Sequence, residues 1–319
     1  MADKSILPVK VRSSIRNIIS DINRNYKSLG KKLASVSKKI KTKSNFELRK
    51  SEIHYLISKT NNETKKEIAE YSHVLAKAGV IKNINEFTKL DIPKVLPDKW
   101  YEYLDVVNDI LRRKVIYYYN LEQEDGRTLE ERIKTLIYGA EETVEALIKQ
   151  GIEEGWSAWE LANKIEQYIS PDRRSKLVSP WSIIRADKDM PISYIPENVP
   201  AGAVDFNAYR IAITELTNHY RWAVVDSSKD CPFVVGWRWV LSPLHPKKDI
   251  CDDWASHEEG IGFGVYSDAD EIMKFGHPFC KCDIYTITVF HKEFKKYFDK
   301  AYKKLDISDK ILESAGLLE

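Results

Sequence analysis

The stretch GHPFCKCDIY (276–285) constrains the fold of this chain more than any other, because it sets three potential metal ligands directly before a strand-like run. His277, Cys280 and Cys282 precede residues 283–290, where apolar and threonine side chains alternate as in a half-buried strand. Two of the chain's four cysteines therefore lie at the start of a predicted strand, and whatever they contact must come from elsewhere in the chain.

A second segment, HPKKDIC (245–251), supplies the remaining candidates. Zinc prefers thiolate and imidazole donors, and structural sites usually draw them from two short segments. In extended backbone Cys280 and Cys282 face the same side, so both can reach one ion. The predicted ligands, with zinc as the expected metal, are Cys251, His277, Cys280 and Cys282, with His245 as a fifth. The alternative is that the thiols pack in a core and His277 caps a loop, since cysteine is often buried.

Imidazole and carboxylate groups also mix over thirteen positions, as in a metal-dependent nuclease. These are His245, Asp249, Asp252, Asp253 and His257. Adjacent carboxylates diverge in a strand, and no third group is identifiable that would orient a Cys–His pair for nucleophilic catalysis. We therefore expect a protein that is not an enzyme. The alternative is a metal-dependent nuclease or toxin-like enzyme that uses His245, Asp249, His257 and His277.

The first two-thirds of the chain has the apolar spacing of helices. Apolar residues recur at three- and four-residue steps from Val11 to Leu29, and Gly30 is the expected stop. Residues 31–43 are basic with few bulky apolar side chains, which favours a mobile connector or arm. Further helices are expected around 46–60, 63–78 and 98–120.

Two capping boxes give firmer boundaries. Thr128 with Glu131 opens a helix that is expected to end at Gly151, and Ser157 with Glu160 opens a shorter one. Irregular connections over 170–203, a helix over 206–226, strands over 236–242 and 283–290, and a helical tail complete the prediction. The fold class is α+β, with a mainly helical N-terminal region followed by a small mixed α/β C-terminal domain that carries the His/Cys cluster. The expected domains are 1–125, 126–292 and a tail over 293–319.

Charge is spread unevenly along the 319 residues. The net charge is +2, but residues 1–50 hold 14 Lys and Arg against three acidic residues, which is +11 and leaves −9 for the remainder. A basic segment on an acidic body favours an anionic partner such as DNA, although a solvated helix face has the same composition. The predicted contacts are Lys31, Lys32, Lys38, Lys39, Lys41 and Lys43.

No apolar run is long enough for a membrane span, and the start lacks a signal-peptide segment, so we expect a cytosolic protein.

The order of motifs in the C-terminal third resembles the phage Mu F-like minor head proteins, also called phage head morphogenesis proteins. The resemblance rests on the Trp-rich GWRWVLS, then HPKKDIC, a Gly-containing loop and HPFCKC, over roughly 236–287. It extends more weakly to ALIKQGIEEGWSAWELANKI and to AYRIAITELTNHY, where Thr214 and Glu215 match an Arg-Thr-Glu helix. The chain departs from the family at Ile213, Trp254 and Lys281, which stand where relatives carry Arg, a second Cys and Arg.

This resemblance implies a structural protein of a tailed phage or phage-derived particle. Such a protein associates with the portal protein and other capsid proteins at the head interior or portal vertex, assists head assembly in the host cytoplasm, and is in a position to contact packaged DNA. A further alternative is a zinc-stabilised nucleic-acid-binding regulator that works without phage partners.

Overall fold

A computed structural model describes most of the chain. The described residues are 8–40, 42–113, 128–157, 160–162, 164–165, 204–243, 245, 248–277, 280–298 and 307–318. The helices are α1 (Val9–Ser37), α2 (Lys43–Lys89), α3 (Ile92–Val95), α4 (Pro97–Arg113), α6 (Leu129–Glu153), α9 (Val204–Asp226), α10 (Ile250–Ser256), α11 (Ala269–Ile272), the 3-10 turn η2 (Phe294–Lys296) and α13 (Asp309–Ser314). The strands are β1 (Val234–Val240), β2 (Val265–Tyr266) and β3 (Asp283–Thr288).

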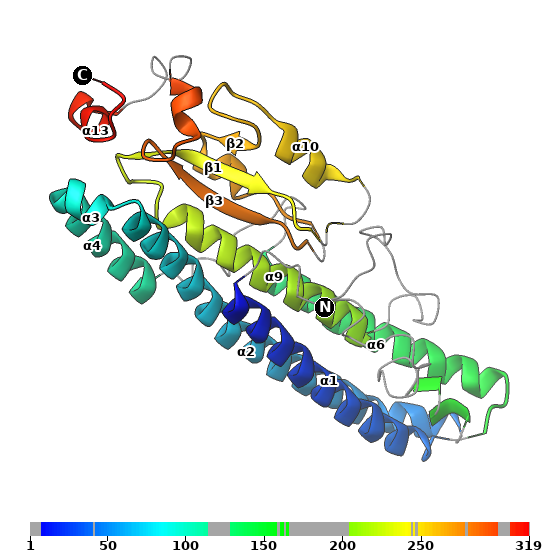
Figure 1. Cartoon of the computed structure of the whole chain (residues 1–319). Coiled ribbons are helices and arrows are strands. Elements are labelled where there is room, and N and C mark those ends of the chain that lie inside the picture. The colour runs from blue at the N-terminus through cyan, green and yellow to red at the C-terminus, as the bar shows by residue number, and fades with distance from the viewer. Residues whose placement is uncertain are drawn as a thin grey trace.

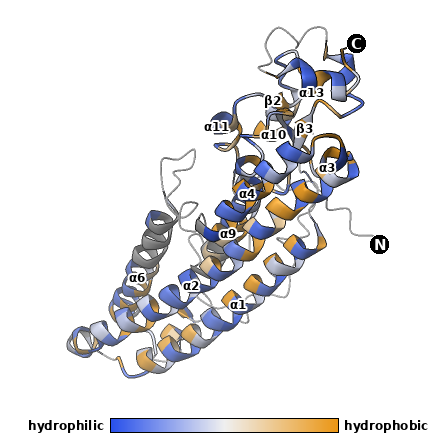
Figure 2. Cartoon of the chain, turned by 90° about the vertical axis from the view of Figure 1, so that its left-hand side faces the viewer, coloured by the Kyte–Doolittle hydropathy of each residue, from blue (hydrophilic) through white to orange (hydrophobic). Residues whose placement is uncertain are grey.

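The long helices α1, α2, α6 and α9 run side by side and form an elongated helical layer (Figure 1). Hydrophobic residues form stripes along α1 and α2, and these stripes supply much of the core (Figure 2). The helices α2 and α9 approach closely at Gly79, where a Cβ atom would clash with the backbone carbonyl of Tyr220. Glycine is therefore required at this crossing, because any larger residue would push the two helices apart.

A three-stranded antiparallel sheet in the order β2-β1-β3 lies over one end of α9 (Figure 1). The end of β1 pairs with the start of β3, with Val240 opposite Asp283. Lys82 of α2 fastens the sheet to the helices: its Nζ donates to Asp283 Oδ2 at 2.9 Å and to the carbonyl of Ile284 at 2.7 Å. It also lies 3.6 Å from the ring centre of Tyr285.

The predicted α+β class is confirmed, with a helical N-terminal region and a small sheet near the His/Cys cluster. Both capping boxes are present: Thr128 with Glu131, and Ser157 with Glu160. The expected strands and the helix at 206–226 occur with shifts of about two residues at their ends. The domain boundaries stay a prediction, and residues 114–120 and 170–203 of the predicted elements lie outside the described part of the chain.

The prediction that Gly30 ends the first helix and that a mobile connector follows is wrong. Helix α1 continues to Ser37, with Leu33, Ala34 and Val36 buried. These residues extend the apolar stripe of the preceding turns. Their burial outweighs the cost of about 1 kcal/mol that an internal glycine adds to a helix.

The two helices predicted over 46–60 and 63–78 form one helix, α2. Asn61 lies at the expected break, yet it is buried and its side chain accepts a hydrogen bond from Tyr26 of α1. Thr60 and Thr64 are buried beside it, and the Thr64 hydroxyl donates to the carbonyl of Thr60, so two side chains that favour a turn in isolation, those of Asn61 and Thr64, form hydrogen bonds within the bundle.

The helix that begins after Thr128 ends two residues later than predicted, at Glu153: Gly151 lies inside the helix, and the glycine with left-handed backbone that follows its end is Gly155, with φ 71°. Among the described helices, none is long and apolar enough to cross a membrane.

Candidate metal centre

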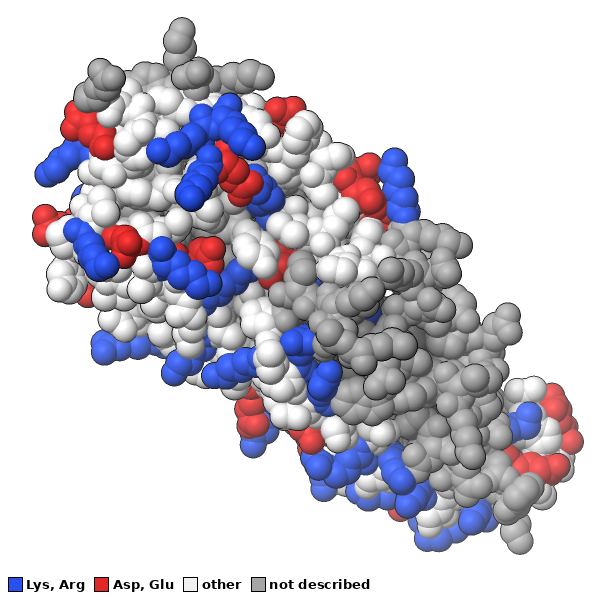
Figure 3. Space-filling model, viewed as in Figure 1, with Lys and Arg blue, Asp and Glu red and all other residues white. Residues whose placement is uncertain are grey.

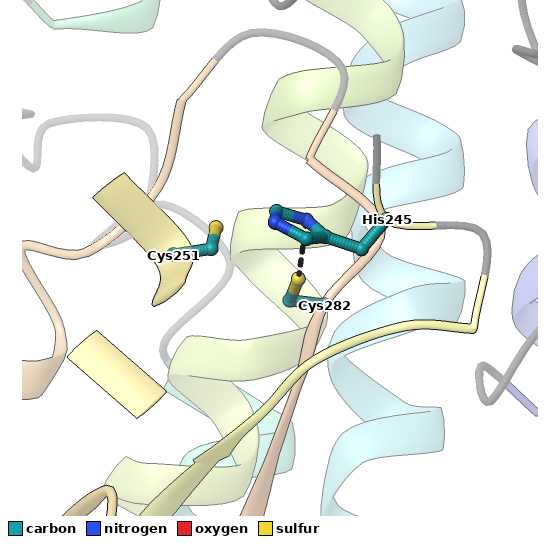
Figure 4. Close-up of side chains that lie close together, drawn as sticks. All are labelled: His245, Cys251 and Cys282. Carbon is teal, nitrogen blue, oxygen red and sulfur yellow. Dashed lines mark hydrogen bonds between the residues drawn. The ribbon is translucent and has the colours of Figure 1, made fainter. Parts of the chain in front are cut away.

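All five predicted ligands lie together, in two overlapping groups that share Cys251. One group is His245, Cys251 and Cys282, and Figure 4 shows these side chains converging from three segments. The other is Cys251, His277 and Cys280. Within each group the donor atoms lie within 4.8 Å of one another, so the cluster could hold a metal ion. This is the arrangement that the two sequence segments predicted.

The fold explains why segments 26 or more residues apart meet here. His245 follows β1, whereas Cys280 and Cys282 immediately precede β3, and these antiparallel strands bring that end of β1 against the start of β3. Cys251 enters from the first turn of α10, where Asp249 is the N-cap and accepts from the Cys251 N–H at 2.7 Å. The pairing of β1 with β3 therefore brings His245, Cys280 and Cys282 together, and the cap of α10 places Cys251 beside them.

Two donor pairs have the spacing of neighbouring ligands in a tetrahedral zinc site, although Cys280 belongs to a different group from His245 and Cys282. With Zn–S of about 2.3 Å and Zn–N of about 2.0–2.1 Å, tetrahedral neighbours lie about 3.8 Å apart for two sulfurs and about 3.6 Å for sulfur and nitrogen. The Sγ atoms of Cys251 and Cys280 are 3.6 Å apart, and Cys282 Sγ is 3.7 Å from His245 Nδ1. His277 Nε2 is only 3.0 Å from Cys251 Sγ, which is the spacing of a direct hydrogen bond.

Two carboxylates orient His245. Its Nε2 lies 2.9 Å from Asp252 Oδ2 and 3.5 Å from Asp249 Oδ1, while Nδ1 faces Cys282. A carboxylate on the far ring nitrogen fixes the tautomer and makes the near nitrogen a better ligand, as in many protein zinc sites. The pKa of the Asp252 carboxyl is lowered, first by the hydrogen bond from the Asp249 backbone N–H and also by His245.

A buried arginine adjoins the thiols. The Arg221 side chain on α9 is 1% exposed, donates to Cys280 Sγ at 3.1 Å and to the carbonyl oxygen of Cys282, and lies 4.8 Å from the ring centre of Trp239. A buried cation requires a nearby negative charge. Three thiolates and Zn²⁺ carry a net charge of −1, so a zinc-loaded cluster and Arg221 would be electrically neutral together.

Arg221 also lowers the pKa of a cysteine thiol in the cluster when no metal is bound. Burial by itself raises the pKa of Cys280, but hydrogen bonds from Cys251 and Cys282, together with the Arg221 charge, hold it well below the usual value. The pKa of Cys251 is raised, first by its hydrogen bonds to Cys280 and Cys282. The cluster therefore favours one thiolate, at Cys280, that its neighbours stabilise.

Aromatic side chains close the site on the side of α10. Trp254 stacks on Phe275 with ring centres 4.5 Å apart, and Trp239 packs against both rings edge-on. The ring of His277 lies 6.4 Å from that of Trp254. Trp239 belongs to the same buried cluster as Cys251, Cys280 and Cys282, and Trp254 and Phe275 pack against that cluster.

Sequence reasoning missed Arg221 and the orienting role of Asp252. A signal for the first was present, because Arg221 is a lone charge in the apolar part of a predicted helix.

Of the residues in the nuclease hypothesis, His245, Asp249 and His277 lie in the cluster, with His277 Nε2 3.7 Å from Asp249 Oδ2. His257 instead pairs with Glu259 at 3.1 Å and stacks on a tyrosine of β2.

The predicted nucleic-acid contacts lie on the helical layer. Lys31 and Lys32 are exposed on α1, and Lys38 and Lys39 are exposed just after it. Lys41 lies outside the described residues, as does the side chain of Lys43, whose backbone begins α2.

The comparisons with known proteins give no relative from which a family could be assigned. No family model, no curated protein and no solved structure matches the chain.

Proposed function

We propose that this protein is a minor head protein of a tailed phage or phage-derived particle, and that a zinc ion clasps its C-terminal fold. Support for the first part comes from the order of the Trp-rich strand, HPKKDIC and HPFCKC segments described above. Its partners are then the portal protein and other capsid proteins, and its place is the head interior or portal vertex.

The observation that carries a structural role for the cluster is the burial of its donors. The side chains of Cys251, Cys280 and Cys282 are 0%, 2% and 1% exposed. Structural zinc sites are closed by four protein ligands, whereas catalytic sites keep a position open for water or substrate. A site with three buried thiols and two imidazoles to choose from has enough ligands to close around an ion.

The metal would be held by Cys251, Cys280, Cys282 and His245, and His277 would donate a hydrogen bond to Cys251 Sγ. Binding of Zn²⁺ at this place would join the end of β1, the start of α10 and the start of β3. Zinc binding energy contributes directly to folding when the site exists only in the folded chain.

One observation favours a second candidate, a metal-dependent nuclease. His245, Asp249 and Asp252 form a further group whose donor atoms lie within 4.8 Å of one another, and all three are partly exposed. Such a group suits a hydrolytic cation. Incubation of the purified protein with plasmid DNA and magnesium, manganese or zinc separates the candidates: intact plasmid agrees with the structural role, and cleavage that His245→Ala abolishes establishes the enzyme.

The assembly role is tested in the phage or particle that encodes the protein. We expect the chain to co-purify with its portal protein and expect deletion of its gene to lower the yield of infectious heads. Complementation with the wild-type gene should restore the yield, whereas the Cys280→Ser gene should not. Normal numbers of DNA-filled, infectious heads in the deletion strain would refute the proposal.

A further inference from the structure

The outward face of α1 has an unusual composition. Helix α1 contains seven Lys and Arg residues and one acidic residue, Asp21. Its apolar residues, apart from the exposed Val9 at its first position, are buried against α2 and α9, so most of the basic residues lie on the opposite side. Figure 3 shows Lys and Arg gathered over α1 along the lower right of the molecule, with few Asp or Glu among them.

Four of the basic residues and an asparagine are arranged in a row. Positions 10, 17, 24, 31 and 38 recur every seven residues, which is close to two helical turns, and they therefore lie on one stripe. The occupants are Lys10, Asn17, Arg24, Lys31 and Lys38, all exposed. At 1.5 Å per residue this stripe is about 42 Å long. The positions between them on the same face are largely serines, which are also exposed.

This composition differs from that of an ordinary solvated helix face. On α2, lysines and arginines alternate with glutamates, as in the pairs Arg49–Glu52 and Lys66–Glu70. On α1 the acidic residue Asp21 pairs with Arg24, whose side chain is still 70% exposed. Lys, Arg, Ser and Asn are the side chains that contact nucleic-acid phosphates, because all of them donate hydrogen bonds and some add positive charge.

From these observations we infer that the outward face of α1, the stripe from Lys10 to Lys38 with its intervening serines, binds the phosphate backbone of double-stranded nucleic acid without sequence preference. The stripe spans about one turn of a duplex, which carries one phosphate charge per 1.7 Å of its axis. The inference goes beyond the proposed function and does not depend on it.

Two other anionic partners fit less well. Single strands are bound by aromatic side chains on which bases stack, but Tyr26, the one aromatic residue of α1, is buried. Membrane-surface helices insert an apolar face into lipid, but the apolar face of α1 is occupied by α2 and α9. The surface left for contact is polar and basic, which complements the phosphate charge of a duplex.

The position of the stripe on a packed helix replaces the prediction, made from the sequence, that residues 31–43 form a mobile arm. Lys31 and Lys32 belong to a helix that is packed on the bundle, and Lys38 is the residue that caps its end. A preorganised row of charges loses little conformational entropy on binding, whereas a mobile arm would have to be ordered. Binding should therefore depend on the helix as well as on the number of charges.

The test compares two triple variants of the full chain that remove the same charge. Lys10→Gln/Lys31→Gln/Lys38→Gln alters the stripe. The control, Lys59→Gln/Lys66→Gln/Lys77→Gln, alters exposed lysines on α2. Circular dichroism and thermal melting should match wild type for both variants, because every altered side chain is exposed.

Binding to a 30-base-pair DNA duplex of random sequence is measured by fluorescence anisotropy between 50 and 200 mM salt. Each lost phosphate contact lowers the salt slope by about 0.9, so the stripe variant should lose about 2–3 from the slope while the control keeps it. Equal losses in both variants would overturn the inference, since net charge alone would then explain binding. It would also be overturned by absent duplex binding at 50 mM salt, or by tighter binding to a single strand or to phosphatidylserine vesicles.

Discussion

Replacement of Cys280 by serine should separate a zinc clasp from a packed core, because the two predict effects of different size. Cys280 Sγ lies 3.6 Å from Cys251 Sγ and 3.1 Å from the Arg221 guanidinium. As a zinc ligand its loss should release the metal. As a core residue its loss would mainly remove the negative partner of a buried arginine.

The two magnitudes can be compared with the stability of a domain. Structural zinc contributes roughly 10–16 kcal/mol in small peptides at neutral pH, whereas domains are stable by about 5–15 kcal/mol in total. Loss of zinc should therefore unfold the sheet and α10. Breaking a buried charged pair without a metal costs about 3–5 kcal/mol, which lowers the melting temperature but leaves a folded domain.

The chain offers a matched control in Cys231→Ser. Cys231 is also a free, buried cysteine, but it lies in a part of the core separate from the His/Cys cluster, in the same group of buried residues as Phe233 and Phe87. We expect Cys231→Ser to cost about 1–3 kcal/mol and to retain zinc.

The measurements are urea unfolding followed by tryptophan fluorescence and zinc content by elemental analysis. In wild type, a chelator should reproduce the Cys280→Ser phenotype. The reasoning would be refuted if wild type were insensitive to chelator and both variants were folded with losses of a few kcal/mol.

Three further outcomes follow from the contacts. Asp252→Asn should weaken zinc affinity about 10–100-fold in a competition titration, because the carboxylate that orients the imidazole is lost, while the neighbouring Asp253→Asn should not. Lys82→Ala leaves Asp283 buried without its cation and should lower the free energy of unfolding by about 3–5 kcal/mol; an unchanged urea midpoint would refute this. The pKa of Glu145 is lowered, since hydrogen bonds from a lysine and a histidine of α2 outweigh burial, which alone would raise it. Its stabilising contribution is therefore present above the ordinary value of 4.5 and is lost as pH falls through the lowered value, and Glu145→Gln should flatten that part of the stability profile.

Local signals predicted the C-terminal part of the fold well. The capping boxes at Thr128 and Ser157 and the alternation after Cys282 depend on neighbouring residues, so they can be recognised without knowledge of the rest of the chain. The meeting of the two Cys/His segments was also predictable, because five soft ligands in two short segments favour a shared site.

The bundle was less predictable because its elements depend on distant contacts. Gly30 and Asn61 are local stop signals, yet both lie inside long helices where burial and a hydrogen bond from Tyr26 offset their preference. Arg221 could be assigned a role only when α9 was seen to pass beneath the cysteines. In each case the deciding partner lies far away in the sequence.

The central claim, that the cluster is a structural zinc site, is tested most directly by the metal content of the native protein. The chain is purified without chelator and without a metal-affinity step, and its zinc is measured by elemental analysis against protein concentration. The account predicts one equivalent of zinc per chain, which Cys251→Ser removes and Cys231→Ser retains. Less than about a tenth of an equivalent in freshly purified wild type would contradict it, and the cysteines and His277 would then stabilise the domain by packing and hydrogen bonds alone.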